Sequence, residues 1–254
     1  MNPAGGHAEA PPAAVDCYRL DLSRNDPDDL ALLDEAENQR AARFRFDRDR
    51  RRFIAAHAQT RRVIGEHLGV DPAALRFATT RHGKPILAGD GIGLAFNLTH
   101  SGAVGYLAIA SFSVGIDVEQ HRPFDDLQPL IDDYCSPAEI AALAALSPPA
   151  RAAAFLGVWT RKEAALKAWG TGIGAVPLDT LHVGLSHPAS AAQDALPGMI
   201  HDGIGYPALR LLTLPGQQQV LSIAAACAVP MAVRLAGASP AQRPPDDAAR
   251  PADT

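Results

Sequence analysis

Two carboxylates stand two residues apart in the sequence GIDVE, residues 115–119. On a strand, residues two apart point to the same face, so Asp117 and Glu119 should project together while Ile116 and Val118 turn to the core. Adjacent carboxylates repel each other unless a cation lies between them. Hard oxygen ligands suit Mg²⁺, which keeps phosphate oxygens in its remaining positions. A solvated strand end with two acids is the alternative interpretation.

A second polar group occurs in the sequence WTRKEAALK, residues 159–167. Helical spacing places Thr160, Glu163 and Lys167 on one face, because residues three and four apart are neighbours on a helix. An ordinary surface ion pair between Glu163 and Lys167, worth about 0.3–0.5 kcal/mol, is one interpretation. The other makes Glu163 a third metal ligand or a general base and places Lys167 on a phosphate.

Two further stretches offer hydrogen-bond donors for phosphate oxygens. In the sequence RHGKP, the glycine and Pro85 are expected to fix a turn that holds Lys84 outward. In the sequence FNLTHSG, Thr99 and His100 leave a strand end in a cluster of short donors. A lone histidine is more often structural than a ligand, but the flanking hydroxyls weaken that alternative.

Residues 40–62 contain nine arginines against only Asp47 and Asp49. This segment is either a solvated helix face or a basic wall for a polyanion, such as a nucleotide phosphate or an acidic partner protein. The whole chain has a formal net charge of -5. That balance argues against a protein whose main activity is binding nucleic acid.

The elements that must position these residues follow from periodicity, in the order strand, helices, strands, then helices and strands again. The pattern predicts helices over 27–45, 48–68, 137–146 and 150–169. It predicts strands over 15–22, 75–79, 95–97, 104–111, 114–118, 181–185, 209–214 and 220–228. An α+β protein is therefore expected.

Two α+β halves of comparable size fit this order, an N-terminal subdomain of residues 15–112 and a C-terminal one of residues 113–236. The ends, 1–14 and 237–254, are rich in Pro, Ala and Gly and are expected to be disordered.

Three cysteines, Cys17, Cys135 and Cys227, are far apart and odd in number, which favours neither a disulfide framework nor a zinc site. We expect a reducing, cytoplasmic location. No apolar run approaches the roughly 18 residues needed to span a bilayer, so no membrane association is expected. The N-terminus lacks the basic segment and apolar core of a signal peptide.

Taken together, these stretches resemble the 4′-phosphopantetheinyl transferase superfamily, in its stand-alone type that activates surfactin synthetase and similar assembly lines. The resemblance rests on GKP, FNLTHS, GIDVE and WTRKEAALK, which occur in the family's order with similar spacing. With the arginine-rich segment they cover about residues 40–175. Thr99 and Thr160 stand where the family usually has serine, and both keep a hydroxyl. Past Gly174 little can be aligned, so substrate preference is not carried over.

The resemblance implies two similar subdomains related by a pseudo-twofold axis, with coenzyme A bound in the cleft between them. It implies a Mg²⁺ ion held by Asp117, Glu119 and Glu163. It implies that coenzyme A is held by Arg52, Lys84, Pro85, Thr99 and His100. Because one chain completes this cleft, we expect a monomer.

The implied reaction transfers phosphopantetheine from coenzyme A to a serine of an acyl or peptidyl carrier protein, in polyketide, nonribosomal peptide or related biosynthesis. Adenosine 3′,5′-bisphosphate is released. Glu163 would take the serine proton and Lys167 would stabilise the leaving phosphate.

Two other functions stay open at this point. A magnesium-dependent nuclease could use the same acids, but it would need a broad basic surface, which the chain lacks outside residues 40–62. A non-catalytic homologue that only binds coenzyme A or the carrier protein is the other, and the presence of all three carboxylates and Lys167 counts against it.

Overall fold

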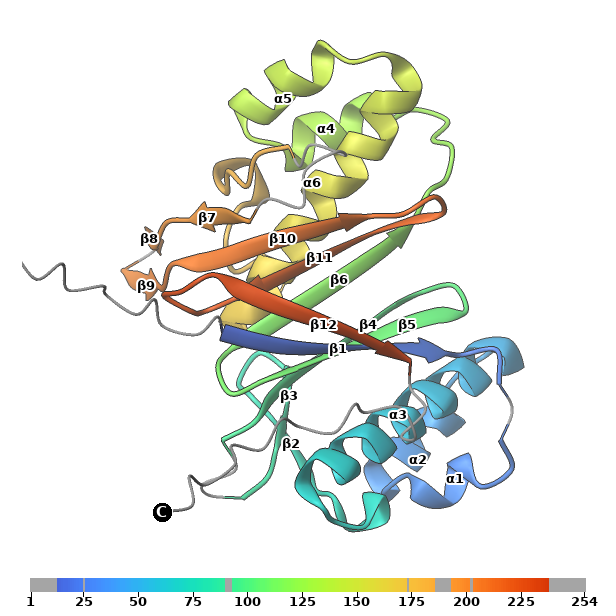
Figure 1. Ribbon diagram of the computed structural model, residues 1–254. Coiled ribbons are helices and arrows are strands. Elements are labelled where there is room, and N and C mark those ends of the chain that lie inside the picture. Colours follow the sequence, from blue (N-terminus) through green and yellow to red (C-terminus); the bar gives the residue numbers. More distant parts are fainter. Residues whose placement is uncertain are drawn as a thin grey trace, which may run out of the picture.

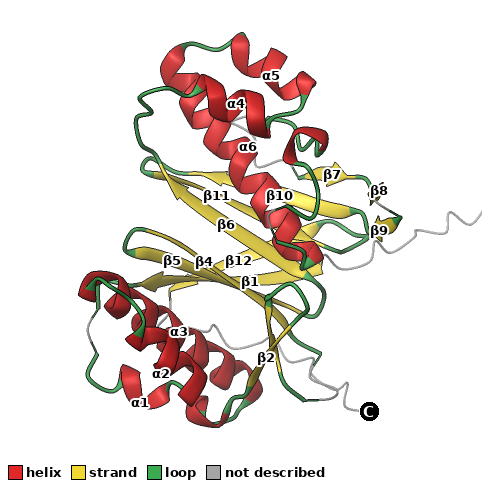
Figure 2. Cartoon of the chain, turned by 180° about the vertical axis from the view of Figure 1, so that it is seen from behind, coloured by secondary structure: helices red, strands yellow, loops and turns green. Residues whose placement is uncertain are grey.

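Two four-stranded sheets pack against each other in the centre of the molecule, and helices cover the outer face of each (Figure 1). The computed structural model describes residues 13–24, 26–89, 93–172, 174–185, 193–201 and 203–237. Apolar side chains fill three levels: between α3 and the first sheet, between the two sheets, and between α6 and the second sheet. The view from behind in Figure 2 shows the same order of layers. The predicted α+β class is confirmed.

The first sheet has the strand order β12-β1-β5-β4. Its part of the chain contains β1 (Ala13–Asp21), α1 (Asp29–Leu32), α2 (Glu35–Ala42), α3 (Asp47–Leu68), the β2–β3 hairpin (Phe77–Thr79 and Pro85–Leu87), β4 (Ala95–Ser101) and β5 (Val104–Ala110). Antiparallel pairing joins β1 to β5 and β5 to β4.

The second sheet has the strand order β6-β11-β10-β7 and is antiparallel throughout. The rest of the chain contains β6 (Val114–Gln120), α4 (Gln128–Tyr134), α5 (Pro137–Ala144), α6 (Pro148–Trp169), β7 (Asp194–Leu196), β8 (Met199–His201), β9 (Ile204–Tyr206), β10 (Leu209–Pro215), β11 (Gln219–Ala225) and β12 (Met231–Gly237).

Each half carries one long helix whose ends are set by the sequence. In α3, Asp47 and Asp49 lie in the first turn, where carboxylates complement the positive end of the helix dipole. Both α3 and α6 end at a glycine with positive φ, Gly69 at 66° and Gly170 at 72°, a conformation that a residue without Cβ adopts without strain. These helices confirm the predictions for 48–68 and 150–169.

Two predicted elements differ from the structure. The helix expected over 27–45 is broken into α1 and α2, because Leu33 is extended and Asp34 starts a new helix by forming a capping box with Glu37. The strand expected over 181–185 is absent. The N–H of Val183 donates to Glu139 and its carbonyl accepts from Arg161, so side chains satisfy this backbone instead of a neighbouring strand.

The last strand changes the expected division of the chain. β12 was assigned by sequence to the C-terminal subdomain, but it pairs in parallel with β1 in the first sheet. Met231 supplies the reason, because it is buried in the core between the sheets. The boundary near residues 112 and 113 and the pseudo-twofold relation stay predictions.

The predicted disordered ends lie almost wholly outside the described residues. Where they overlap the described part, Ala13 and Ala14 belong to β1 and Gly237 to β12, so these three residues are in strands. Across the described segments, no helix is both long enough and apolar enough to cross a membrane.

Candidate active site

Four of the predicted site residues, Thr99, His100, Asp117 and Glu119, lie where β4 of the first sheet is beside β6 of the second. Side chains at every second residue of β4 bond across this seam: Asn97 Oδ1 accepts from the Ile116 N–H (2.8 Å), Thr99 Oγ1 donates to Asp117 Oδ1 (3.0 Å) and Ser101 Oγ donates to Glu119 Oε2 (3.2 Å). The period of two matches the alternation of side chains along β4. The seam therefore joins the donors of the FNLTHSG sequence directly to the paired acids.

Gly115 allows α6 to lie directly on β6. A Cβ at this position would lie 2.0 Å from the carbonyl oxygen of Ala164 and 2.4 Å from the nitrogen of Ala168, far inside van der Waals contact. This close approach brings Lys167 Nζ to 2.5 Å from Asp117 Oδ1. Thr160, which the helical pattern placed beside Glu163, is instead fully buried, and its hydroxyl lies 2.8 Å from Ser222 Oγ on β11.

The three acids share a desolvated environment. Asp117 and Glu163 are only 6% and 8% exposed. Burial raises the pKa of Asp117, and burial together with the charge of Asp117 raises the pKa of Glu119. Burial, with the charges of Asp117 and Glu119, also raises the pKa of Glu163, although Lys167 opposes this shift. Among the described residues, Lys167 pairs with Asp117 and not with Glu163, the ion pair that was one of the two interpretations of the helix.

Two oxygens of this cluster, Asp117 Oδ2 and Glu163 Oε1, are buried and have no hydrogen-bond partner within the described residues. Among all residues that the structure describes, no group of three or more His, Cys, Asp or Glu side chains is arranged closely enough to hold a metal ion. The donor set itself nevertheless fits a hard cation, because three carboxylates face one lysine and two buried oxygens lack a partner.

His100 lies next to this cluster, at the end of β4. Partial desolvation of its ring, with the positive charges of Lys167, Arg52 and His57, lowers its pKa. Arg52, from α3, is partly buried and lies 3.9 Å from Asp49. Basic side chains of α3 and α6 thus lie near His100.

Lys84 is placed differently from the sequence expectation. Its ammonium does not extend outward but donates to the carbonyls of Val114 (3.0 Å) and Lys167 (2.6 Å). Burial lowers the pKa of Lys84 to about 8. Lys84 therefore ties the β2–β3 turn to the end of α6, and a contact with coenzyme A stays a prediction.

A cavity of about 360 Å³ opens between α2, α3 and strands β2 to β4. Apolar side chains form its walls, among them Phe77, Pro85, Phe96 and Leu98. Thr60, only 5% exposed, also lines it, and its hydroxyl has no hydrogen-bond partner among the described residues. The cavity has the size and walls expected for a heteroaromatic base.

Sequence reasoning missed part of this site. Asn97 makes a seam contact that depends on which strand lies beside β4, and Ser101, expected only as a donor to phosphate, makes another. Thr60 and His57 fall within the apolar stripe of α3. For His57, its position among apolar residues was the one sequence feature that could have indicated a functional role.

The arginine-rich segment also divides into two groups. Arg61 is fully buried in an ion-pair network, whereas the N-terminal arginines of the segment are exposed: Arg40, Arg43, Arg45, Arg48 and Arg51.

Comparison with known protein families matches most of the chain to the family that its sequence motifs resemble. Residues 113–203 match the model of the 4′-phosphopantetheinyl transferase superfamily, and residues 28–113 match that of the N-terminal part of 4′-phosphopantetheinyl transferase.

Individual relatives agree. The 4′-phosphopantetheinyl transferase HetI of Nostoc is 37% identical over 183 residues, which span 70% of this chain and 76% of HetI. A phosphopantetheinyl transferase of Thraustochytrium is 33% identical, over 65% of this chain and 64% of that protein. The 4′-phosphopantetheinyl transferase Sfp of Bacillus subtilis is 28% identical, over 61% of this chain and 68% of Sfp.

These comparisons assign the fold, with its acidic seam between two helix-covered sheets, to a class of transferases. The chain belongs to the 4′-phosphopantetheinyl transferase superfamily, which confirms the resemblance seen in its sequence.

Proposed function

We propose that this protein transfers the 4′-phosphopantetheine group of coenzyme A to a serine of an acyl or peptidyl carrier protein, releasing adenosine 3′,5′-bisphosphate. One observation supports this most directly. Three buried or half-buried carboxylates and Lys167 meet at a seam that adjoins a cavity large enough for a nucleoside. The names of the relatives point to the same reaction.

The seam supplies groups for the pyrophosphate. Asp117, Glu119 and Glu163 would hold a Mg²⁺ ion, which when bound offsets the negative charge of the phosphates. Lys167, displaced from Asp117 Oδ1, would stabilise the charge that develops on the leaving phosphate. Thr99, His100 and Arg52, which lie near these acids or near Lys167, would serve as further donors to the phosphates.

Glu163 is the proposed general base for the acceptor serine. Its Oε1 has no partner within the described residues, so it is available to accept a proton. Burial and the neighbouring acids raise its pKa, which makes it a stronger base than an exposed glutamate. The proton would leave the serine hydroxyl as its oxygen attacks phosphorus, and the bond to the bisphosphate would break.

The nucleoside of coenzyme A is proposed to occupy the cavity between α2, α3 and β2 to β4. Phe77, Pro85 and Phe96 offer apolar surfaces to the adenine, and the Thr60 hydroxyl offers an unused polar group. Exposed arginines from the end of α2 to the first turns of α3, Arg43, Arg45, Arg48 and Arg51, suit an acidic carrier protein and would speed its encounter.

We also propose that the protein acts as a monomer in a reducing, cytoplasmic compartment. Every residue assigned above comes from one chain, and the three cysteines are free.

Intact mass measurement of an apo carrier protein tests the proposal. After incubation with this protein, coenzyme A and Mg²⁺, the carrier should gain about 340 Da, the mass of one phosphopantetheine group, and EDTA should prevent the gain. Binding of coenzyme A without transfer to any acyl or peptidyl carrier would favour the non-catalytic homologue. Cleavage of plasmid DNA with Mg²⁺ and no transfer would favour the nuclease.

A further inference from the structure

The ammonium of Lys84 bridges the two elements that carry the reacting groups of the proposed mechanism. It donates to the carbonyl of Val114 at 3.0 Å and to the carbonyl of Lys167 at 2.6 Å. Val114 is the first residue of β6, the strand that carries Asp117, and Lys167 lies in the last turn of α6. One side chain from the β2–β3 turn therefore ties the backbone of Lys167 to the strand of Asp117.

The turn that carries Lys84 is closed by its own hydrogen bonds. The Thr80 N–H donates to the Lys84 carbonyl (2.9 Å), and the Lys84 N–H donates to Thr80 Oγ1 (3.1 Å). Between them, Gly83 has a φ of 81°, which a residue without Cβ adopts without strain. A Cβ at Gly170 would lie 3.6 Å from Lys84 Cδ, so the lysine stem runs close beside the end of α6. The ammonium thus extends from a well-bonded turn to a defined place at the helix end.

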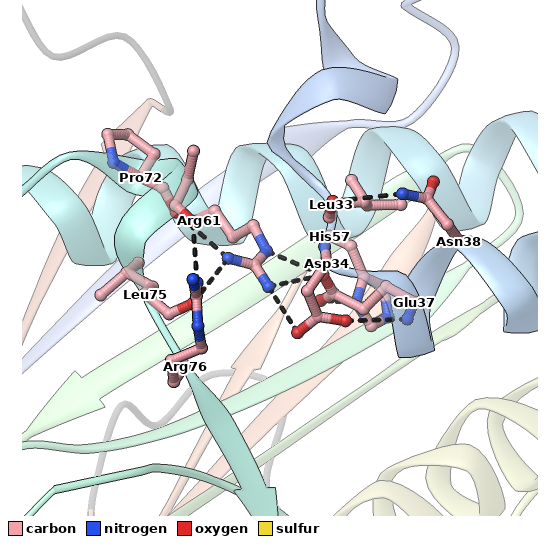
Figure 3. A network of polar contacts seen from close by, with 10 residues as sticks. Leu33, Asp34, Glu37, Asn38, His57, Arg61, Pro72, Leu75 and Arg76 are labelled. Atoms are coloured by element: carbon pink, nitrogen blue, oxygen red, sulfur yellow. Dashed lines mark hydrogen bonds and ion pairs between the residues drawn. The ribbon is translucent and has the colours of Figure 1, made fainter.

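Lys84 differs from the fully buried cations of the protein in its partners. Among the described residues, each of those cations has a carboxylate partner: Arg61 with Asp34 and Glu37 (Figure 3), Arg161 with Asp194, and Lys162 with Glu139. Within the same described part of the chain Lys84 has only the two carbonyls, and burial lowers its pKa to about 8. Burying an ammonium without a carboxylate costs free energy that an apolar side chain avoids. Stability of the fold alone therefore does not explain a lysine here.

Lys167 is the residue that this contact affects. Its ammonium lies 2.5 Å from Asp117 Oδ1, which it reaches from the last turn of a helix. Backbone carbonyls in a last turn lack intrahelical partners, and helix ends fray. We infer that Lys84 is a positioning residue, which holds the backbone of Lys167 so that its ammonium reaches the phosphates, and that Lys84 does not itself bind coenzyme A. This inference rests on the proposed function.

The first test is Lys84→Met, assayed by transfer to an apo carrier protein with detection by intact mass. We expect kcat to fall about 10- to 100-fold, because misplacing a reacting group by about 1 Å can cost that much. KM for coenzyme A should change by less than about twofold, since a contact that acts only in the transition state lowers kcat without weakening substrate binding. The melting temperature at neutral pH should stay the same or rise, because methionine fills the space without burying a charge.

A double-mutant cycle tests whether Lys84 acts through Lys167. In the Lys167→Met background, adding Lys84→Met should lower kcat by less than about twofold, because the group that Lys84 positions is already absent. A residue that bound the substrate independently would cause its full loss in both backgrounds.

Ser113→Ala is the matched control. The Ser113 hydroxyl donates to the carbonyl of Ala168, which is the next residue along the same helix end. Its removal takes one hydrogen bond from the end of α6 and leaves the carbonyl of Lys167 bonded to Lys84. We expect kcat of this variant to stay within about twofold of the unaltered protein.

A raised KM for coenzyme A with unchanged kcat in Lys84→Met would overturn the inference and make Lys84 a direct contact of the substrate. Equal losses of kcat in both backgrounds, or the same loss in Ser113→Ala, would also overturn it. So would a Lys84→Met variant that no longer folds, because the lysine would then serve the fold. Absence of transfer by the unaltered protein would instead contradict the proposed function, so the two failures are distinguishable.

Discussion

At the residue scale, the site contains more buried negative charge than the described residues compensate. Asp117 and Glu163 are almost fully buried, Glu119 is half-buried, and Lys167 is the cation that pairs with them. Such an arrangement costs stability unless a further cation is bound. The excess charge is thus better explained by binding of a ligand than by stability of the fold.

The substitution Glu163→Gln distinguishes a role of this carboxylate in ligand binding and catalysis from a role in the stability of the fold. We expect kcat to fall by at least about 10²-fold, because the amide can neither accept the serine proton nor contribute a charge. The melting temperature without metal should stay the same or rise, since the raised pKa of Glu163 means that its ionised form destabilises the folded state at neutral pH. Steady-state kinetics and thermal unfolding check this, with Glu66→Gln, exposed on α3, as the control. Near-normal turnover would remove Glu163 from the mechanism.

The burial of Lys84 predicts the direction in which the stability of the fold changes with pH. Its pKa of about 8 lies below the ordinary lysine value of 10.5, so between these values the folded state has lost a proton that the unfolded state keeps. Stability rises with pH wherever the unfolded state binds more protons. The melting temperature of the unaltered protein relative to Lys84→Met should therefore increase between about pH 8 and 10. A difference that does not vary with pH would contradict the burial of this ammonium.

At the element scale, the contact between α6 and β6 determines the geometry of the site. Gly115→Ala should cost about 3 kcal/mol or more, the upper end for overpacking, because the new methyl group meets helix backbone and not a flexible side chain. Chemical denaturation measures the loss. Gly205→Ala in β9 is the control, since its Cβ would meet nothing within 4 Å. A small, equal effect of both substitutions would mean that α6 does not need this close approach.

The sequence predicted this contact only in part. Periodicity was sufficient for the helix over 150–169 and the strand over 114–118, and the family resemblance then placed Asp117, Glu163 and Lys167 in one group. It could not show that Lys84 would donate to Val114 and to Lys167, because these contacts join residues 30 and 83 positions apart. Local patterns carry no information on such pairs, which depend on how complete elements pack.

At the scale of the whole molecule, the two halves are joined by more than the seam. The first strand and the last pair in parallel, β1 with β12, although more than two hundred residues separate them. Sequence patterns missed β12 because its residues, MAVRLAG, show no clear alternation of apolar and polar positions, and only its first residue is fully buried. β12 thus forms one edge of the first sheet, beside β1, and its residue Met231 packs in the core between the sheets.

Two substitutions in β12 test whether this strand belongs to the common core. Met231 is 3% exposed and packs between the sheets, so Met231→Ala should lower the free energy of unfolding by about 2–5 kcal/mol, as for other large-to-small changes in a core. Leu235 on the same strand is 63% exposed, and Leu235→Ala should change it by less than about 0.5 kcal/mol. Urea unfolding followed by circular dichroism measures both. If the Met231 variant unfolded like the Leu235 variant, β12 would be an accessory strand, and the two sheets would have to be held together by the seam and the remaining core alone.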